Sequence, residues 1–102
     1  MYRASDEVAE EEWLAELEEV ADRLGLGSAA RSRAADLFLS TVPESDRSKR
    51  ATLATSLYVG ALTERDRRSQ REVADAAGVA RLTVQKRWKE MMEQAGLDPP
   101  DW

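Results

Sequence analysis

Residues 70–89, QREVADAAGVARLTVQKRWK, contain the most specific structural pattern in this chain. Ser69, just before it, and Glu72 have the spacing of a capping box, in which a hydroxyl and a carboxylate bind the free amides at a helix start. Gly78 supplies the left-handed backbone on which a helix commonly ends. The spacing therefore predicts two helices joined by the turn Gly78-Val79-Ala80.

Small and apolar residues define the inward faces of these two helices. In the first they are Val73, Ala74 and Ala77, and the small Ala74 lets a second helix cross closely. In the second they form one stripe at helical spacing, made of Val84, Trp88, Met91, Met92 and Ala95. The pattern predicts a helix-turn-helix over about residues 69–96, a motif that places its second helix in a DNA groove. A tight helical corner in an all-α domain is the alternative.

The polar side of the second predicted helix is basic. From Arg81 to Lys89 the chain has four basic residues and no acidic one. At 100° per residue, Lys86, Lys89 and Leu82 lie opposite the apolar stripe, with Arg81 and Gln85 flanking them. These five residues are the candidate DNA contacts. Solvated surface charge is the alternative for the lysines, and a local hydrophobic staple is the alternative for Leu82.

The net charge of the whole chain does not suggest DNA binding, but the charges are unevenly distributed along it. Twenty acidic and fifteen basic residues give a net charge of −5, whereas nucleic-acid modules usually carry a basic excess. Residues 1–26 hold nine acids and two bases, and residues 27–95 hold nine acids and thirteen bases. The acid is therefore concentrated at one end, in an acidic first helix predicted over about residues 5–24.

The rest of the chain is predicted to be helical as well. The buried face of the first helix is predicted to consist of Trp13, Leu14, Leu17, Val20, Ala21 and Leu24, which recur at helical spacing. Ser28 is expected to cap a second helix that runs to about Thr41 and stops before Pro43. Ser45 or Asp46 should cap a third, which is apolar over most of its circumference and so should be central in the core. The charged segment 63–68 is expected to link this helix to the helix-turn-helix.

These elements predict an all-α fold of five helices in a single domain of residues 1–102. The chain has no Cys and no His, so neither a thiolate or histidine metal site nor the commonest general base is available. No glycine-rich loop or nucleophile elbow is present, and we expect no catalytic activity, cofactor or metal. Without a long apolar run or a signal-peptide pattern, the chain is expected to be soluble and cytoplasmic.

Two stretches give the chain a likeness to a known family. Residues 50–58 (RATLATSLY) and 70–90 (QREVADAAGVARLTVQKRWKE), with a weaker segment over 24–38, resemble a cyclin-like repeat of archaeal transcription factor B, the relative of eukaryotic transcription initiation factor IIB. The likeness covers roughly residues 24–95. It implies a five-helix cyclin-like domain that ends in a helix-turn-helix.

The resemblance also implies partners and contacts. In that family the domain sits on the TATA-binding protein and DNA, and its recognition helix lies in the major groove upstream of the TATA box. Leu82 and Gln85 stand at the family's base-contacting positions, where Gln85 replaces a common Arg. A full factor carries a zinc ribbon and two repeats, whereas this chain has no Cys and room for one repeat.

The leading interpretation is a DNA-binding transcription factor, a regulator or accessory protein of the basal-factor type. Arg47, Lys49, Arg50 and Arg71 are further candidates for phosphate or partner contacts, with surface solubility as the alternative. Expected partners are double-stranded DNA and the TATA-binding protein, with a homodimer less favoured and no membrane. The alternative function is a protein-interaction adaptor that binds a basic partner through its acidic first helix.

Overall fold

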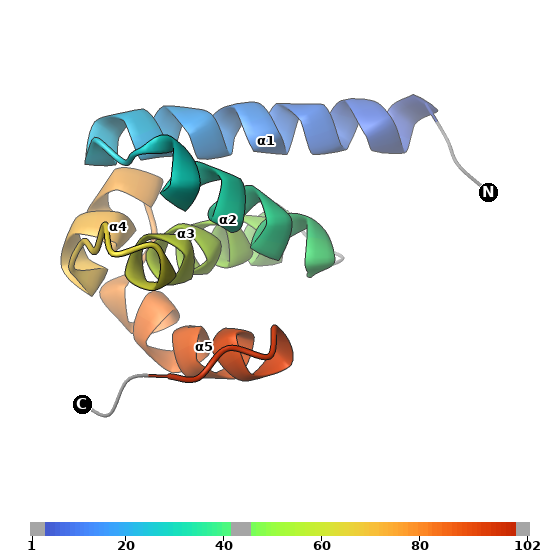
Figure 1. The fold of residues 1–102 in the computed structure, drawn as a ribbon. Helices are drawn as coiled ribbons and strands as arrows, with labels where there is room; N and C mark the ends of the chain where they lie inside the picture. The colour runs from blue at the N-terminus through green and yellow to red at the C-terminus, as the bar shows by residue number, and fades with distance from the viewer. Residues whose placement is uncertain (1–3, 42–45, 100–102) are drawn as a thin grey trace.

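The computed structural model describes residues 4–41 and 46–99, with side chains for residues 10–41 and 48–99 (Figure 1). Over these residues it contains α-helices and no strand, which confirms the all-α prediction. None of the helices in this part is both long and apolar enough to cross a membrane. The elements are α1 (Ala4–Leu24), α2 (Ser28–Ser40), α3 (Asp46–Thr63), α4 (Gln70–Ala77) and α5 (Arg81–Gln94).

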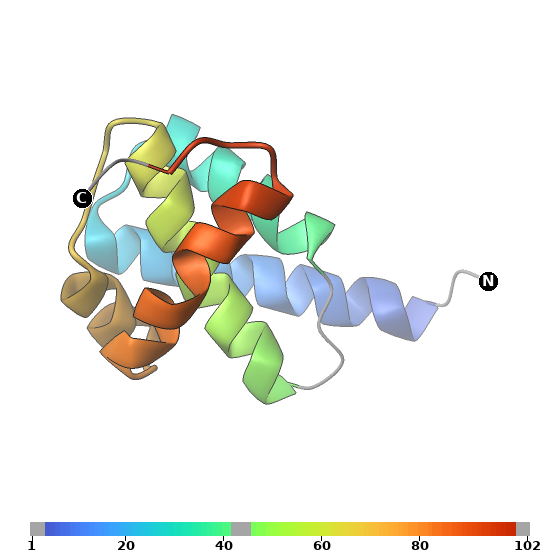
Figure 2. The same cartoon turned by 90° about the horizontal axis from the view of Figure 1, so that it is seen from below.

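Helix α3 is the centre of the fold, as its apolar composition predicted. Figures 1 and 2 show it between α1 and α2 on one side and α5 on the other. Every residue from Ala51 to Ala61 is buried, and Leu53 and Leu57 have no exposed surface. A helix covered on all sides needs apolar or small residues around its whole circumference. The polar residues of this stretch, Thr52, Thr55 and Ser56, are small and are buried as well.

Helices α2 and α3 cross at very short range because α3 has a glycine at the crossing. A Cβ atom on Gly60 would lie 2.9 Å from both the carbonyl oxygen of Ala30 and the amide nitrogen of Ala34. Both neighbours are backbone atoms, and both side chains are already as small as alanine. The close approach therefore depends on the missing Cβ of Gly60, at a position where glycine weakens the helix itself.

The ends of α4 agree with the sequence prediction in detail. The Ser69 hydroxyl accepts a hydrogen bond from the Glu72 amide at 3.0 Å, and the Ser69 amide donates to the Glu72 carboxylate at 3.1 Å. The second bond lowers the pKa of Glu72 from its ordinary value. Gly78 ends the helix with a φ of 74°, where a side chain would be strained.

Predictions about the other helix ends were less accurate. Ser28 is the first residue of α2 rather than its cap, and Gly27 takes the cap position without a side-chain bond. Ala95 follows the end of α5 and is exposed, so it does not extend the apolar stripe. Helix α3 begins at Asp46. Ser45, Pro43 and Trp102 lie outside the described residues.

The charged linker between α3 and α4 is tied to the loop between α1 and α2. Arg68 Nε donates to the Leu24 carbonyl at 2.8 Å, and its Nη2 donates to the Gly25 carbonyl at 3.1 Å. The Gly27 amide donates to Asp66 Oδ2 at 2.7 Å. The two Arg68 bonds satisfy carbonyls that the end of α1 leaves open, and the Asp66 bond satisfies the amide of Gly27 at the start of α2. The linker is thus part of the scaffold that carries α4 and α5.

Replacing Asp66 by asparagine should destabilise the protein at neutral pH and have little effect in strong acid. The Gly27 amide, and then Arg68, hold the pKa of the Asp66 carboxyl below its ordinary 3.8. A lowered pKa means that the stabilisation is complete above the ordinary value and disappears as the pH falls through the lower folded-state pKa. Urea denaturation of both proteins across this pH range measures the difference. A constant difference would show that the charge of Asp66 contributes nothing.

Candidate nucleic-acid interface

The orientation of α5 is set by its buried stripe. Val84, Trp88, Met91 and Met92 are all buried, which confirms four of the five predicted inward residues. The Trp88 ring packs edge-on against Tyr58 of α3, with ring centroids 5.6 Å apart. A large aromatic pair of this kind fixes the rotation of one helix on another. The opposite face of α5 is therefore held toward solvent.

This solvent face carries the candidate DNA contacts. Arg81, Leu82, Gln85, Lys86 and Lys89 are all exposed. Leu82 is 54% exposed, one of the large apolar side chains that the fold leaves uncovered. Its exposure argues against the alternative of a local hydrophobic staple, which would cover it. The Lys89 ammonium lies 5.5 Å from the centroid of the Trp88 ring, a cation–π distance. This contact keeps the charge of Lys89 close to α5.

Two arginines hold the end of α4 and thereby place the turn. Arg23 Nη1 donates to the Ala76 carbonyl at 2.9 Å, and Arg50 Nη1 donates to the Ala77 carbonyl at 3.1 Å. These carbonyls are among the last of α4, where cationic side chains also oppose the helix dipole. Helices α1 and α3 thus fix the point from which α5 starts. Nothing in the local sequence pairs these arginines with α4.

The other predicted phosphate contacts differ in their surroundings. The Arg50 guanidinium also lies 3.4 Å from a Glu16 carboxylate oxygen and 5.4 Å from the centroid of the Trp13 ring, so it is engaged within the protein. Lys49 is half-buried and Arg71 is exposed. Arg47 belongs to α3, but its side chain lies outside the described residues.

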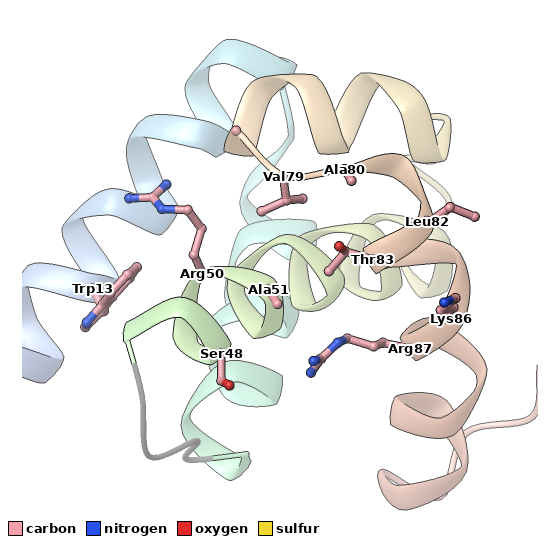
Figure 3. A pocket seen from close by; sticks show the side chains of 11 residues that line it. Trp13, Ser48, Arg50, Ala51, Val79, Ala80, Leu82, Thr83, Lys86 and Arg87 are labelled. Atoms are coloured by element: carbon pink, nitrogen blue, oxygen red, sulfur yellow. The ribbon is translucent and has the colours of Figure 1, made fainter.

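A hollow of about 980 Å³ opens beside the exposed face of α5 (Figure 3). In the figure, Arg87 points into it from α5, whereas Leu82 and Lys86 stand at its outer edge. Trp13, which the sequence placed in the core, is only half-buried and lines the far wall. We call this site the basic hollow. It is lined by Trp13, Ser48, Arg50, Ala51, Gly78, Val79, Ala80, Leu82, Thr83, Lys86 and Arg87, among which none is acidic.

The starts of α4 and α5 contrast sharply. Whereas α4 has a complete capping box, Ala80 at the cap of α5 makes no side-chain bond, and the first turn of α5 has no acidic residue. Arg81 adds a positive charge where the helix dipole is already positive. An uncapped, basic helix start is unfavourable for stability and favourable for binding an anion.

Comparison with known proteins agrees with this architecture. Residues 11–94 match the family model of the transcription factor TFIIB repeat. Transcription initiation factor IIB of Pyrococcus abyssi is 36% identical over 83 residues, which cover 78% of this chain and 28% of that protein. The factor of the same name from Archaeoglobus fulgidus is 33% identical over 78 residues, or 74% of this chain and 24% of that protein.

The fold, with a central α3 and a terminal helix, turn and helix, is that of a cyclin-like all-α domain. The chain belongs to the transcription factor TFIIB repeat family. It spans about 28% of the length of the Pyrococcus abyssi relative. The family resemblance predicted from residues 50–58 and 70–90 is thereby confirmed.

Proposed function

We propose that this chain acts in transcription initiation as a DNA-binding factor, with the exposed face of α5 in the major groove. The observation that carries the proposal is the combination on α5 of a buried stripe and an outward basic face. Four basic residues and no acid lie between Arg81 and Lys89, and the buried Trp88 holds that face outward. A rigid helix with such a face suits the width of the major groove.

The surrounding contacts support this placement. The uncapped start of α5 and Arg81 together would attract a backbone phosphate, as helix starts do in many DNA complexes. Lys86 and Lys89 would supply phosphate contacts along the same face. Leu82 would meet a thymine methyl or the groove wall, and Gln85 would meet a base edge. Helix α4, which leads into α5, is anchored through Arg23 and Arg50, so little ordering would be needed on binding.

Replacing Lys86 and Lys89 by alanine should weaken binding to all DNA sequences about equally. Each lost phosphate contact is expected to lower the slope of log K against log salt by about 0.9, because fewer counterions are released. Both side chains are exposed, so the fold should be unaffected. Titration of labelled duplex DNA at several salt concentrations measures the slope. The matched control is Arg33→Ala, which removes an exposed basic residue on α2 that neither lines the hollow nor belongs to the α5 face.

An unchanged slope in both lysine variants, with binding intact, would remove this face of α5 from the DNA. Absence of salt-dependent DNA binding in the unaltered protein would favour the adaptor function instead. The observation behind that alternative is the exposed acid on α1, which includes Glu10, Glu11, Glu12, Glu18, Glu19 and Asp22. A basic protein partner would then bind through α1.

We further propose that the TATA-binding protein is the partner on DNA. One recognition helix of this size binds weakly at physiological salt unless a second contact is linked to it. The apolar residues of α1, among them Leu17, Val20 and Ala21, are buried in the core. They are therefore not available to form an apolar interface between two copies of the chain on DNA. Sedimentation on promoter DNA with and without the TATA-binding protein tests this. Tight binding by one copy alone would contradict it.

A further inference from the structure

The N-terminal part of α1 extends past the rest of the molecule. Figures 1 and 2, at right angles to each other, both show α1 continuing beyond the ends of α2 and α3. We call residues Ala4–Glu12 the acidic arm, because their sequence contains five carboxylates and no basic residue. Glu10, Glu11 and Glu12 are exposed, and within the described part of the chain none of the three forms an ion pair.

The basic hollow is the electrostatic counterpart of this arm. Arg50, Lys86 and Arg87 line it, and among the described residues neither Lys86 nor Arg87 forms an ion pair. The hollow also offers apolar surface, with Val79 and Ala51 among its lining residues and Leu82 at its edge. A helix with one acidic side is the kind of ligand that this combination of charge and apolar surface would accept.

A chain cannot place its own acidic arm in its own basic hollow. The arm and the wall residue Trp13 belong to one continuous helix, α1, and the arm leads away from the hollow. A second copy has no such restriction. Trp13 directly follows the arm in α1 and also lines the hollow. If the α1 helices of two copies lay antiparallel, the arm of each copy would therefore lie across the hollow of the other copy. A two-fold pair makes the contact twice.

We propose that the acidic arm of one copy binds the basic hollow of a second copy, and that this pair forms in the absence of DNA. Its contacts are between the carboxylates of the arm and the cations of Lys86 and Arg87. Pairs of exposed charges are individually weak and are screened by salt, so the pair should form at low ionic strength and dissociate as salt is added. Such a pair differs from a dimer that binds DNA with two recognition helices.

The pair would have a consequence for DNA binding, which rests on the proposed function. Leu82 and Lys86 belong both to the edge of the basic hollow and to the candidate DNA face of α5. A partner's arm over these residues would block the groove-facing side of α5. DNA and a second copy would then exclude each other, so that DNA binds a single copy.

Charge reversal in two variants tests the pairing without DNA. The arm variant carries Glu10→Lys, Glu11→Lys and Glu12→Lys, and the hollow variant carries Lys86→Glu and Arg87→Glu. All five positions are exposed, and circular dichroism verifies that both variants fold. In sedimentation at low salt the unaltered protein should form dimers, and each variant alone should be monomeric because arm and hollow then repel. An equimolar mixture of the two variants should form dimers again, since both contacts are once more between opposite charges.

The control variant carries Asp36→Lys and Asp75→Lys, two exposed acids on α2 and α4 away from the arm and the hollow. It should pair as the unaltered protein does. A monomeric unaltered protein at low salt, or variants that pair alone or fail to pair when mixed, would overturn the proposal. Duplex DNA added to the dimer should produce complexes with one protein copy. If DNA does not bind at all, the proposed function fails while the pairing result stands.

Discussion

Replacing Gly60 by alanine should lower the free energy of unfolding by about 1–3 kcal/mol, the range for overpacking a tight core. The new Cβ would meet the Ala30 carbonyl and the Ala34 amide at 2.9 Å, so α2 and α3 must move apart. Alanine normally stabilises a helix by about 0.5–1 kcal/mol relative to glycine, which offsets only part of this cost. For a domain of this size, each kcal/mol lowers Tm by roughly 4–8 °C.

The control for Gly60→Ala is Ser32→Ala, an exposed position on α2 where alanine improves helix propensity and adds nothing to the crossing. It should unfold at the same urea concentration as the unaltered protein or slightly above it. Shortening Ala34 to glycine should not rescue Gly60→Ala, because the clash is with backbone atoms. If Gly60→Ala were as stable as the unaltered protein, the close crossing would be incidental to the fold.

Replacing Gln85 by arginine should change which DNA sequence is preferred. Glutamine suits the N6 and N7 groups of adenine, whereas arginine pairs with O6 and N7 of guanine. One such contact discriminates by about 1–3 kcal/mol, which corresponds to roughly 5- to 150-fold in affinity. Gln85 is exposed on α5, so the change should leave the fold intact. Selection from random duplex DNA by both proteins would show the new preference at one position.

A matched control for Gln85→Arg is Gln94→Arg, which adds the same charge at the exposed far end of α5. It should strengthen binding to all sequences slightly, through charge alone, without a shift in preference. If both variants select the same sequences as the unaltered protein, Gln85 makes no base contact. A shift in both would mean that added charge, and not the position of Gln85, determines the outcome.

Local sequence signals predicted much of the helix, turn and helix at the C-terminal end. The capping box of Ser69 and Glu72 and the left-handed Gly78 act within a few residues of each other, so their pattern suffices to place the bounds of α4 and the turn. The inward stripe of α5 was predicted for the same reason. Ala95 was placed wrongly, because a small residue at the right spacing does not reveal that the helix has already ended.

The all-α class, the central position of α3 and the family could be predicted from the sequence alone, since each depends on periodicity or on residues close together in the chain. How the candidate interface is held depends instead on contacts between helices that are far apart in the chain. Arg23 and Ala76 are 53 residues apart in the chain, and Arg68 and Leu24 are 44 apart. The clash at Gly60 and the half-buried Trp13 likewise depend on which helices meet. Periodicity tells which face of a helix is inward, but not which backbone carbonyl an arginine reaches once the helices have packed.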